Sequence, residues 1–350
     1  MDHIKTFSLY GSESPKQIAL HNSSRGENDI RMTYIVEFPN MDKLAVKVTK
    51  NSFTTPERVK GWAELIEHYN NLGIYCPKIV RNKNGEYCSN IDGYLVFAEE
   101  YMKYKPAAGR NESLTGDQKY ERKLYESIGL VAANPAPLVP WHTAYCIYDK
   151  FDITDEYDEN YQCAMELRDY YRDNIPEHAM RAQKLFEEYC RRREKFEPIY
   201  RLLPKSVFQG DINDSNILVD EAGDFKGMID FNLSGTETIL NYAFCESFCC
   251  LEDDSEIDVL LDTEALKKRD AWTAQRLAWI GKHYKFTDEE REAFNEYYNI
   301  VAPFRWTYHC FFLSLLKNRE KYPEGRKYAG HILDWTEYQM TRSDVSSLLP

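Results

Sequence analysis

The chain has 350 residues, of which 43% are hydrophobic and 29% charged, which excludes a disordered or collagen-like protein and leaves room for about two domains. Lysine and arginine number 44 against 57 aspartate and glutamate, a net charge of −13 that argues against general affinity for nucleic acid or anionic membranes. The nine cysteines show no disulfide spacing and the N-terminus has no apolar signal segment, so we expect a cytoplasmic protein.

The first hundred residues are predicted to be mainly strands. Short β-branched and aromatic stretches predict strands over Arg31–Phe38, Leu44–Thr49 and Tyr94–Glu100. A helix is expected before the last of these strands, because Thr55-Pro56 is a typical helix start and Gly73 a typical end.

The rest of the chain is predicted to be mostly helical, with one strand-like region over Val207–Phe231. Helical spacing of apolar residues predicts helices over Glu121–Ala133, Tyr161–Tyr171, His178–Tyr200, Thr263–His283, Thr287–Trp306 and Tyr308–Arg319. The predicted class is therefore α+β, with a small N-terminal lobe over residues 1–101 and a larger helical lobe over residues 102–350.

The segment most informative about chemistry contains Asp211, Asn216 and Asp230. Phosphoryl transfer needs one carboxylate to orient the attacking hydroxyl, and two further oxygen ligands to hold Mg²⁺ on the nucleotide phosphates. Asp211 can serve as the first group, and Asn216 and Asp230 as the metal ligands. Strands on either side of the turn at Glu221–Asp224 would bring these residues together.

This segment resembles the catalytic region of the aminoglycoside phosphotransferase and choline kinase family, which has a bilobal protein-kinase-like fold. The family pattern H-G-D, four residues, N and an apolar pair, followed by a hydrophobic-I-D-F/W element, is matched by Gln209-Gly210-Asp211, Asn216-Ile217-Leu218 and Ile229-Asp230-Phe231. The resemblance implies a kinase that uses Mg²⁺ and ATP, or GTP, to phosphorylate a hydroxyl of a small molecule.

Two positions depart from the family pattern. Gln209 stands where the family has His, and Asn241 stands near the place where an Asp is frequent. The family's His braces the catalytic loop by hydrogen bonds, and Gln carries both a donor and an acceptor for the same task. Whether Gln209 lowers activity stays open at this point.

Lys47 is a charge in the middle of an apolar strand. A lysine there can meet the nucleotide phosphates, as in the V-A-I-K strand of kinases. A buried lysine needs a carboxylate partner. Glu64 on the following helix is the best candidate by its resemblance to the family's helix, with Glu57 and Glu67 as rivals.

The resemblance also places two further nucleotide contacts. The segment with Ser24, Gly26 and Asn28 looks like the family's loop over the phosphates, where a glycine permits close approach of the backbone. The strand Tyr94–Tyr101 resembles the one that leads into the hinge between lobes. The carbonyl of Glu99 and the N–H of Tyr101 would then bind the adenine edge.

The acceptor is less well defined. Residues 149–177 hold ten acidic against three basic residues, and residues 251–264 hold seven against none. These runs are either solvated faces or a wall for a cationic acceptor, so an aminoglycoside or amino sugar is the first expectation. A metabolic kinase for choline, homoserine, a sugar or a nucleoside is the near alternative, and a non-catalytic pseudokinase the alternative of another class. The sequence does not define an oligomeric state.

Overall fold

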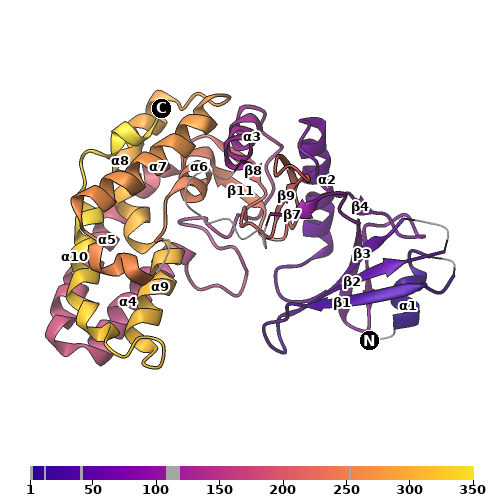
Figure 1. The fold of residues 1–350 in the computed structure, drawn as a ribbon, viewed down its shortest axis with the longest axis horizontal. Helices are drawn as coiled ribbons and strands as arrows, with labels where there is room; N and C mark the ends of the chain where they lie inside the picture. The colour runs from indigo at the N-terminus through magenta and orange to yellow at the C-terminus, as the bar shows by residue number, and fades with distance from the viewer. Residues whose placement is uncertain (1–2, 12, 40–41, 108–118, 252–253) are drawn as a thin grey trace. The chain divides into compact units, whose positions relative to one another are not determined.

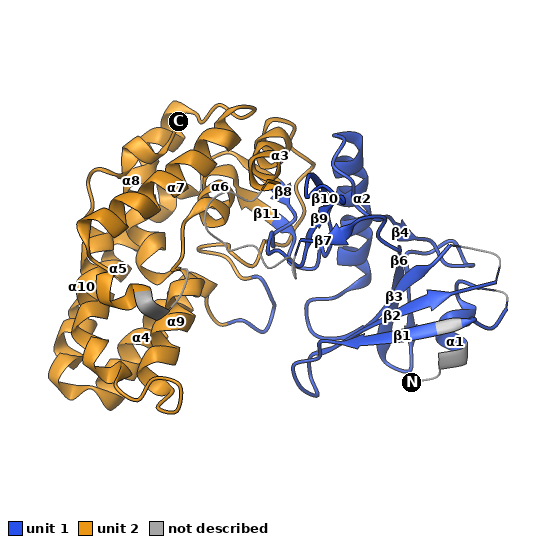
Figure 2. Ribbon diagram, viewed as in Figure 1, with its two compact units in different colours: residues 1–110, 151–155, 207–235 blue, residues 111–150, 156–206, 236–350 orange. Residues whose placement is uncertain are grey.

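The computed structural model describes all residues except 1–2, 12, 40–41, 108–118 and 252–253, and its fold is shown in Figure 1. The chain forms two compact units (Figure 2). Unit 1 contains residues 1–110, 151–155 and 207–235, and unit 2 contains the remainder. The segment around Asp211 therefore groups with the N-terminal sheet, although the sequence placed it in the lobe over residues 102–350.

Unit 1 is built on a six-stranded sheet in which β1, β2, β3, β6 and β4 are successive neighbours and β5 also pairs with β6. All of these pairings are antiparallel. The strands are β1 (Gln17–Asn22), β2 (Ile30–Glu37), β3 (Leu44–Lys50), β4 (Ile79–Val80), β5 (Cys88–Ile91) and β6 (Tyr94–Glu100). The three predicted strands are confirmed within one residue at each end, whereas β1, β4 and β5 were not predicted.

The two faces of this sheet differ because side chains alternate along a strand. On β3, Leu44, Val46 and Val48 join a buried apolar cluster that also contains Phe7 of the short helix α1 (His3–Ser8). The intervening position Lys47 points to the opposite face. There Phe97 of β6 packs against Trp62 of α2 (Pro56–Asn71), with ring centroids 5.9 Å apart. One face is thus a hydrophobic core, and the other carries charge beside a helix.

Helix α2 forms as the sequence predicts. Thr55 is its N-cap and accepts a hydrogen bond from the N–H of Arg58, and Pro56 opens the first turn. The chain leaves the helix through Gly73, whose φ of +82° suits glycine.

Residues 207–235 are fastened to the first part of unit 1 by backbone pairing. Strand β9 (Ile217–Val219) pairs with both β10 (Phe225–Met228) and β7 (Lys105–Pro106). Tyr75 exchanges backbone hydrogen bonds with this hairpin, donating to Lys226 and accepting from Met228. A Cβ at Gly227 would lie 1.7 Å from the Tyr75 carbonyl oxygen, so only glycine allows this approach. A further pair of short strands, β8 (Lys205–Phe208) and β11 (Gly235–Thr238), flanks the segment.

Unit 2 is helical. Its α-helices are α3 (Glu121–Ala133), α4 (Glu159–Asn174), α5 (Pro176–Tyr200), α6 (Ile239–Ser247), α7 (Thr263–Gly281), α8 (Asp288–Val301), α9 (Trp306–Lys317) and α10 (Ala329–Thr341). Short 3₁₀ turns are η1 (Asp254–Val259), η2 (Ala302–Phe304), η3 (Gly325–Tyr328) and η4 (Val345–Leu348). Phe244 is fully buried among aromatic rings, and Gly129 lets α3 approach the Ile280 carbonyl of α7.

The predicted helix over Thr287–Trp306 is wrong in its last five residues. Helix α8 ends at Val301, a 3₁₀ turn containing Pro303 follows, and α9 begins at Trp306. Proline has no N–H for the helical hydrogen bond and disfavours continuation of the helix. Helices α6 and α10 were not predicted. Among the described residues, no helix is both long and apolar enough to cross a membrane.

Candidate active site

The loop that carries Asp211 is shaped by the glycine before it. Gly210 has a φ of +87°, and a Cβ there would lie 2.3 Å from the Leu233 carbonyl oxygen. A side chain at this position would clash with backbone. The Gln-Gly-Asp order therefore fixes a tight turn that presents the Asp211 carboxylate.

Gln209 braces this turn from inside. Its side chain is fully buried, and its Nε2 donates to the carbonyl oxygens of Asp211, Ile229 and Asp230 at 2.8–2.9 Å. Its Oε1 accepts the N–H of Asp211 at 2.7 Å. The expectation that Gln can brace the loop is confirmed, because one amide ties the Asp211 turn to the segment that carries Asp230.

Asp211 is held by two neighbouring amides. The Nδ2 of Asn213 donates to Oδ1 at 2.7 Å, and the Nδ2 of Asn216 donates to Oδ2 at 3.0 Å. Burial raises the pKa of Asp211, and the Asn213 hydrogen bond opposes that shift without cancelling it. A carboxylate with a raised pKa is a better proton acceptor than an ordinary aspartate.

Asn216 and Asp230 offer the oxygens that a magnesium ion prefers. The Asn216 amide nitrogen is taken up by Asp211, which leaves its Oδ1 outside these bonds. Asp230 adopts a φ of +60°, a left-handed conformation that is uncommon for residues other than glycine and that clusters at functional sites. The described residues contain no cluster of three or more His, Cys, Asp or Glu ligands. Two oxygen ligands, from Asn216 and Asp230, suit a Mg²⁺ ion that binds together with nucleotide phosphates, and not a metal held by protein ligands alone.

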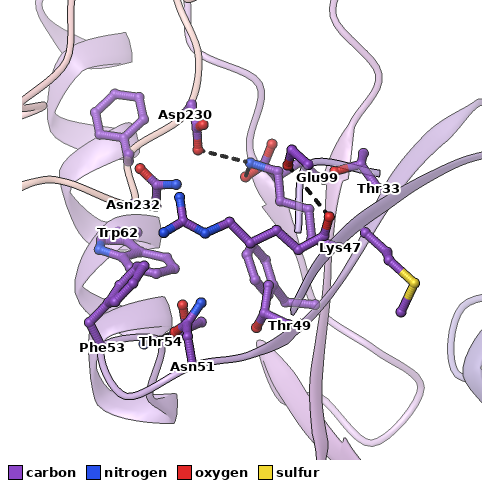
Figure 3. Close-up of a pocket in the computed structure, with 15 residues that line it drawn as sticks. Thr33, Lys47, Thr49, Asn51, Phe53, Thr54, Trp62, Glu99, Asp230 and Asn232 are labelled. Carbon is purple, nitrogen blue, oxygen red and sulfur yellow. Dashed lines mark hydrogen bonds and ion pairs between the residues drawn. The ribbon is translucent and has the colours of Figure 1, made fainter. Parts of the chain in front are cut away.

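Lys47 lies between two carboxylates. Its Nζ is 2.9 Å from Glu99 Oε1 and 3.4 Å from Asp230 Oδ1 (Figure 3). Burial acts to lower the pKa of Lys47, but the two carboxylates outweigh it and the pKa is raised. The ammonium charge is therefore retained at neutral pH.

The predicted pairing of Lys47 with Glu64 is wrong. The Glu64 side chain is 63% exposed and lies 3.7 Å from Lys60 on the same helix. The helix surface that packs on the sheet carries apolar residues such as Trp62. Glu64 thus lies on the solvent face of α2.

The predicted adenine contact at Tyr101 also needs correction. Its N–H donates to the carbonyl oxygen of Lys43 at 3.1 Å, which continues the β3–β6 ladder past Glu100. This donor is therefore occupied by the protein's own backbone. The Glu99 carbonyl lies in strand β6, where Glu99 faces Ala45 on one side and Ile79 on the other.

Ser24, Gly26 and Asn28 lie in the hairpin between β1 and β2, at the predicted place. Ser24 Oγ accepts the N–H of Arg31, and Gly26 has a φ of +127° with open space around a notional Cβ. Their predicted contact with phosphates stays a prediction. The hairpin residues that line the adjacent cleft are Ser23 and Arg25 instead.

One cleft of about 670 Å³ brings these groups together within unit 1. Its lining includes Arg25, Arg31, Lys47, Glu99, Tyr101, Asp211, Asn216 and Asp230. A second, smaller cavity lies beside Lys47 and is drawn in Figure 3. Arg31 lines both, and its bidentate ion pair with Asp29 at 2.7 Å fixes its guanidinium. Arg31 was not predicted as a site residue. Its only indication in the sequence is that it lies two residues before Thr33, on the same face of β2.

The acidic segment over residues 149–177 lies in unit 2 except for residues 151–155, and most of its acidic side chains in unit 2 are paired there. Asp158 forms a buried ion pair with Arg193, and Asp169 pairs with Arg172 at 2.7 Å. Glu166 lies 3.0 Å from His309. In the second acidic segment, Glu252 and Asp253 lie outside the described residues. The acidic residues of the first segment are therefore largely paired with basic residues of unit 2.

Comparison with known proteins places the chain in a family. The sequence profile of the phosphotransferase enzyme family (APH) matches residues 25–240. No curated protein sequence matches. Solved structures similar to this chain include an amicoumacin kinase in complex with AMP-PNP and Ca²⁺ (TM-score 0.58, 13% identity, 99% of this chain and 95% of that chain).

A microcompartment-associated aminopropanol kinase is also similar (TM-score 0.54, 14% identity, 97% and 98% coverage), as is a spectinomycin phosphotransferase in complex with ADP and spectinomycin (TM-score 0.50, 10% identity, 99% and 95% coverage). At these identities the likeness shows a shared fold, and it confirms the predicted kinase-like α+β architecture. The family match spans more than half of the chain and includes Lys47, Asp211, Asn216 and Asp230. The chain belongs to the phosphotransferase enzyme family and is a small-molecule kinase.

Proposed function

We propose that this kinase transfers the γ-phosphoryl group of ATP or GTP to a hydroxyl of a small acceptor that carries an amine. The observation that supports the reaction most strongly is the convergence of Lys47, Asp211, Asn216 and Asp230 on one cleft. Together they supply what phosphoryl transfer requires. Lys47 is a cation for the phosphates, Asp211 is a proton acceptor, and Asn216 and Asp230 are oxygen ligands for a metal.

Asp211 orients the acceptor hydroxyl and accepts its proton as the new oxygen–phosphorus bond forms, while the bond between the γ-phosphorus and the β,γ-bridging oxygen breaks and the nucleoside diphosphate leaves. The amides of Asn213 and Asn216 hold the carboxylate in one orientation, so little rearrangement is needed during the reaction. Lys47 contributes a protonated ammonium for the nucleotide phosphates. Asn216 and Asp230 would hold Mg²⁺, which when bound neutralises charge on the phosphates.

An amine-bearing acceptor is supported by the acidity of the protein. A net charge of −13 raises the local concentration of small cations. The similar solved structures also include kinases named for amicoumacin, aminopropanol and spectinomycin. Many acidic side chains of residues 149–177 are paired with basic residues of the protein, so they give less support to an acidic wall that binds the acceptor.

A ligand screen followed by an activity assay tests the proposal. Thermal shifts are first measured with Mg²⁺ plus ATP or GTP, because a ligand that binds the native state raises the melting temperature. Phosphorylation is then assayed against amino sugars, amino alcohols, choline, homoserine, sugars and nucleosides. We expect a nucleotide-dependent shift and a phosphorylated amine-bearing product. A shift without turnover of any acceptor would favour a pseudokinase, and turnover of only neutral acceptors would contradict the amine.

A further inference from the structure

The carboxylate that holds Lys47 comes from an unexpected element. It belongs to Glu99 on β6, the strand beside β3 in the same sheet. Phe97 lies directly opposite Lys47 in the β3–β6 ladder, and Glu99 is two residues further along the same face. Ala45 lies opposite Glu99, and its small side chain leaves space for Lys47 to reach the carboxylate diagonally.

Helix α2 offers no competing carboxylate to Lys47. The part of α2 that packs near Lys47 presents Trp62, which is 2% exposed and packs on Phe97. The acidic residues of α2, Glu57, Glu64 and Glu67, all lie on its exposed surface, so the two rivals of Glu64 are wrong as well. Figure 3 shows Lys47 with Glu99 and Asp230 on one side of the cavity and Trp62 with Phe53 across from them.

Two carboxylates share Lys47 unequally. The Lys47–Glu99 distance is 2.9 Å and the Lys47–Asp230 distance is 3.4 Å. The Glu99 side chain is 12% exposed, whereas that of Asp230 is 36% exposed. The tighter and more buried partner is thus the one that is not a candidate metal ligand.

We propose that Glu99 is a positioning residue that aligns Lys47 for the nucleotide phosphates from within the sheet and keeps Asp230 available for the metal. The backbone hydrogen bonds between β3 and β6 fix the relative position of Lys47 and Glu99. The alignment of Lys47 is consequently independent of how α2 docks. Without the Glu99 charge, Asp230 is the remaining carboxylate paired with Lys47, and that pairing competes with metal binding.

The inference rests on the proposed function, and nucleotide affinity tests it apart from turnover. Calorimetric titration with Mg-nucleotide should show that Glu99→Gln raises Kd by about tenfold or more, because Lys47 then donates to a neutral amide oxygen in place of a carboxylate. Higher Mg²⁺ concentrations should also be needed for binding, while KM for the acceptor stays unchanged. Glu99→Asp keeps the charge and should recover part of the affinity.

Two comparisons separate this role from a merely structural one. Glu64→Gln, the same substitution on the exposed face of α2, should bind nucleotide like wild type. In a Lys47→Met background, Glu99→Gln should cause no further loss of affinity, because a residue that acts through Lys47 has nothing left to position. If Glu99→Gln merely damaged the fold, it would lower nucleotide affinity in the Lys47→Met background as well as in wild type.

The outcomes are distinguishable. Wild-type affinity in Glu99→Gln, or an equal loss in Glu64→Gln, would overturn the role of Glu99 while leaving the proposed function intact. An additional loss in the Lys47→Met background would overturn it as well, by showing that Glu99 acts independently of Lys47. If wild type binds neither Mg-ATP nor Mg-GTP, the proposed function fails, and the inference fails with it.

Discussion

Each unit contains a cation that is mostly withdrawn from solvent and paired with a carboxylate, Lys47 at 18% and Arg193 at 9% side-chain exposure, and the two pairs differ in what surrounds them. In unit 1, Lys47 with Glu99 and Asp230 lines a cleft, and Asp230 is 36% exposed. In unit 2, Arg193 and Asp158 form an ion pair in which the side chains are 9% and 5% exposed, at the edge of a smaller cavity of about 290 Å³. Asp158 also caps α4 by accepting the N–H of Tyr161, and Arg193 donates to Tyr189 Oη.

The difference separates a pair suited to a ligand from a pair suited to the fold. Asp158 and Arg193 make further contacts within unit 2. The backbone N–H of Tyr148 donates to Asp158, and the Tyr148 ring lies 4.3 Å from the Arg193 guanidinium. Around Lys47, by contrast, Asp230 is 36% exposed, and Asp230 and Asn216 both line the cleft. Burial of charge is common to both pairs, so remaining coordination capacity distinguishes the candidate active site.

The largest effect is expected among the residues that line the cleft of unit 1, from Asp211→Asn. Turnover should fall by about two to four decades, the usual range for a positioned acid–base group, while nucleotide affinity stays near wild type. Steady-state kinetics with the best acceptor measures this. Asp214→Asn, a matched substitution in the same loop, should leave turnover near wild type. Undiminished turnover in Asp211→Asn would remove this residue from catalysis.

At the ion pair of Arg193 and Asp158, Arg193→Met should lower the free energy of unfolding. It leaves the Asp158 carboxylate buried without its cation, which costs about 3–5 kcal/mol of unfolding free energy. Urea denaturation measures the change. Arg191→Met, on the same helix but with a 50% exposed side chain, should cost less than about 1 kcal/mol. Similar losses in both variants would contradict a special role of the buried pair.

A smaller contrast is expected between the two candidate metal ligands. Asp230→Asn removes an anionic oxygen, whereas Asn216→Ala removes a neutral one, so the first should weaken Mg²⁺-dependent nucleotide binding more, by about tenfold or more. Mg²⁺ titrations at fixed nucleotide concentration compare them. Unchanged Mg²⁺ dependence in both variants would exclude these residues from the metal site.

The smallest effect is a shift in pH dependence. Burial raises the pKa of Asp211, and only its ionised form accepts a proton. Activity should therefore be present above this pKa and be lost as the pH falls through it. The acid limb of kcat/KM should be centred above about 3.9, the ordinary aspartate value. A limb at or below that value would mean that Asp211 is not shifted or is not the base.

The sequence predicted the parts of this molecule that depend on local signals. Helix α2 was predicted from Thr55, Pro56 and Gly73, and strand β6 from its apolar run, because caps and periodicity are local. The spacing of Asp211, Asn216 and Asp230 suggested that they meet, and they line one cleft. The break at Pro303 was missed because helical spacing continues across it.

The charge partner of Lys47 could not be predicted from local signals. Glu64 and Glu99 are both acidic and both near Lys47 in the family-like arrangement, and the choice depends on strand register. The β3–β6 ladder places Glu99 diagonally from Lys47, and the packing of Trp62 turns Glu64 toward solvent. Register and helix rotation are properties of the assembled sheet, which one sequence does not reveal.

The most direct test of the contrast between the two pairs measures two quantities on two variants, Lys47→Met and Arg193→Met. Unfolding free energy is obtained from urea denaturation, and Mg-nucleotide Kd by calorimetry at a temperature where both variants are folded. We expect crossed results: Lys47→Met loses nucleotide affinity by about tenfold or more and loses less stability than Arg193→Met, because Glu99 and Asp230 stay more exposed than Asp158, whereas Arg193→Met binds nucleotide normally. An equal loss of stability in both variants, or a loss of affinity in Arg193→Met, would contradict this contrast.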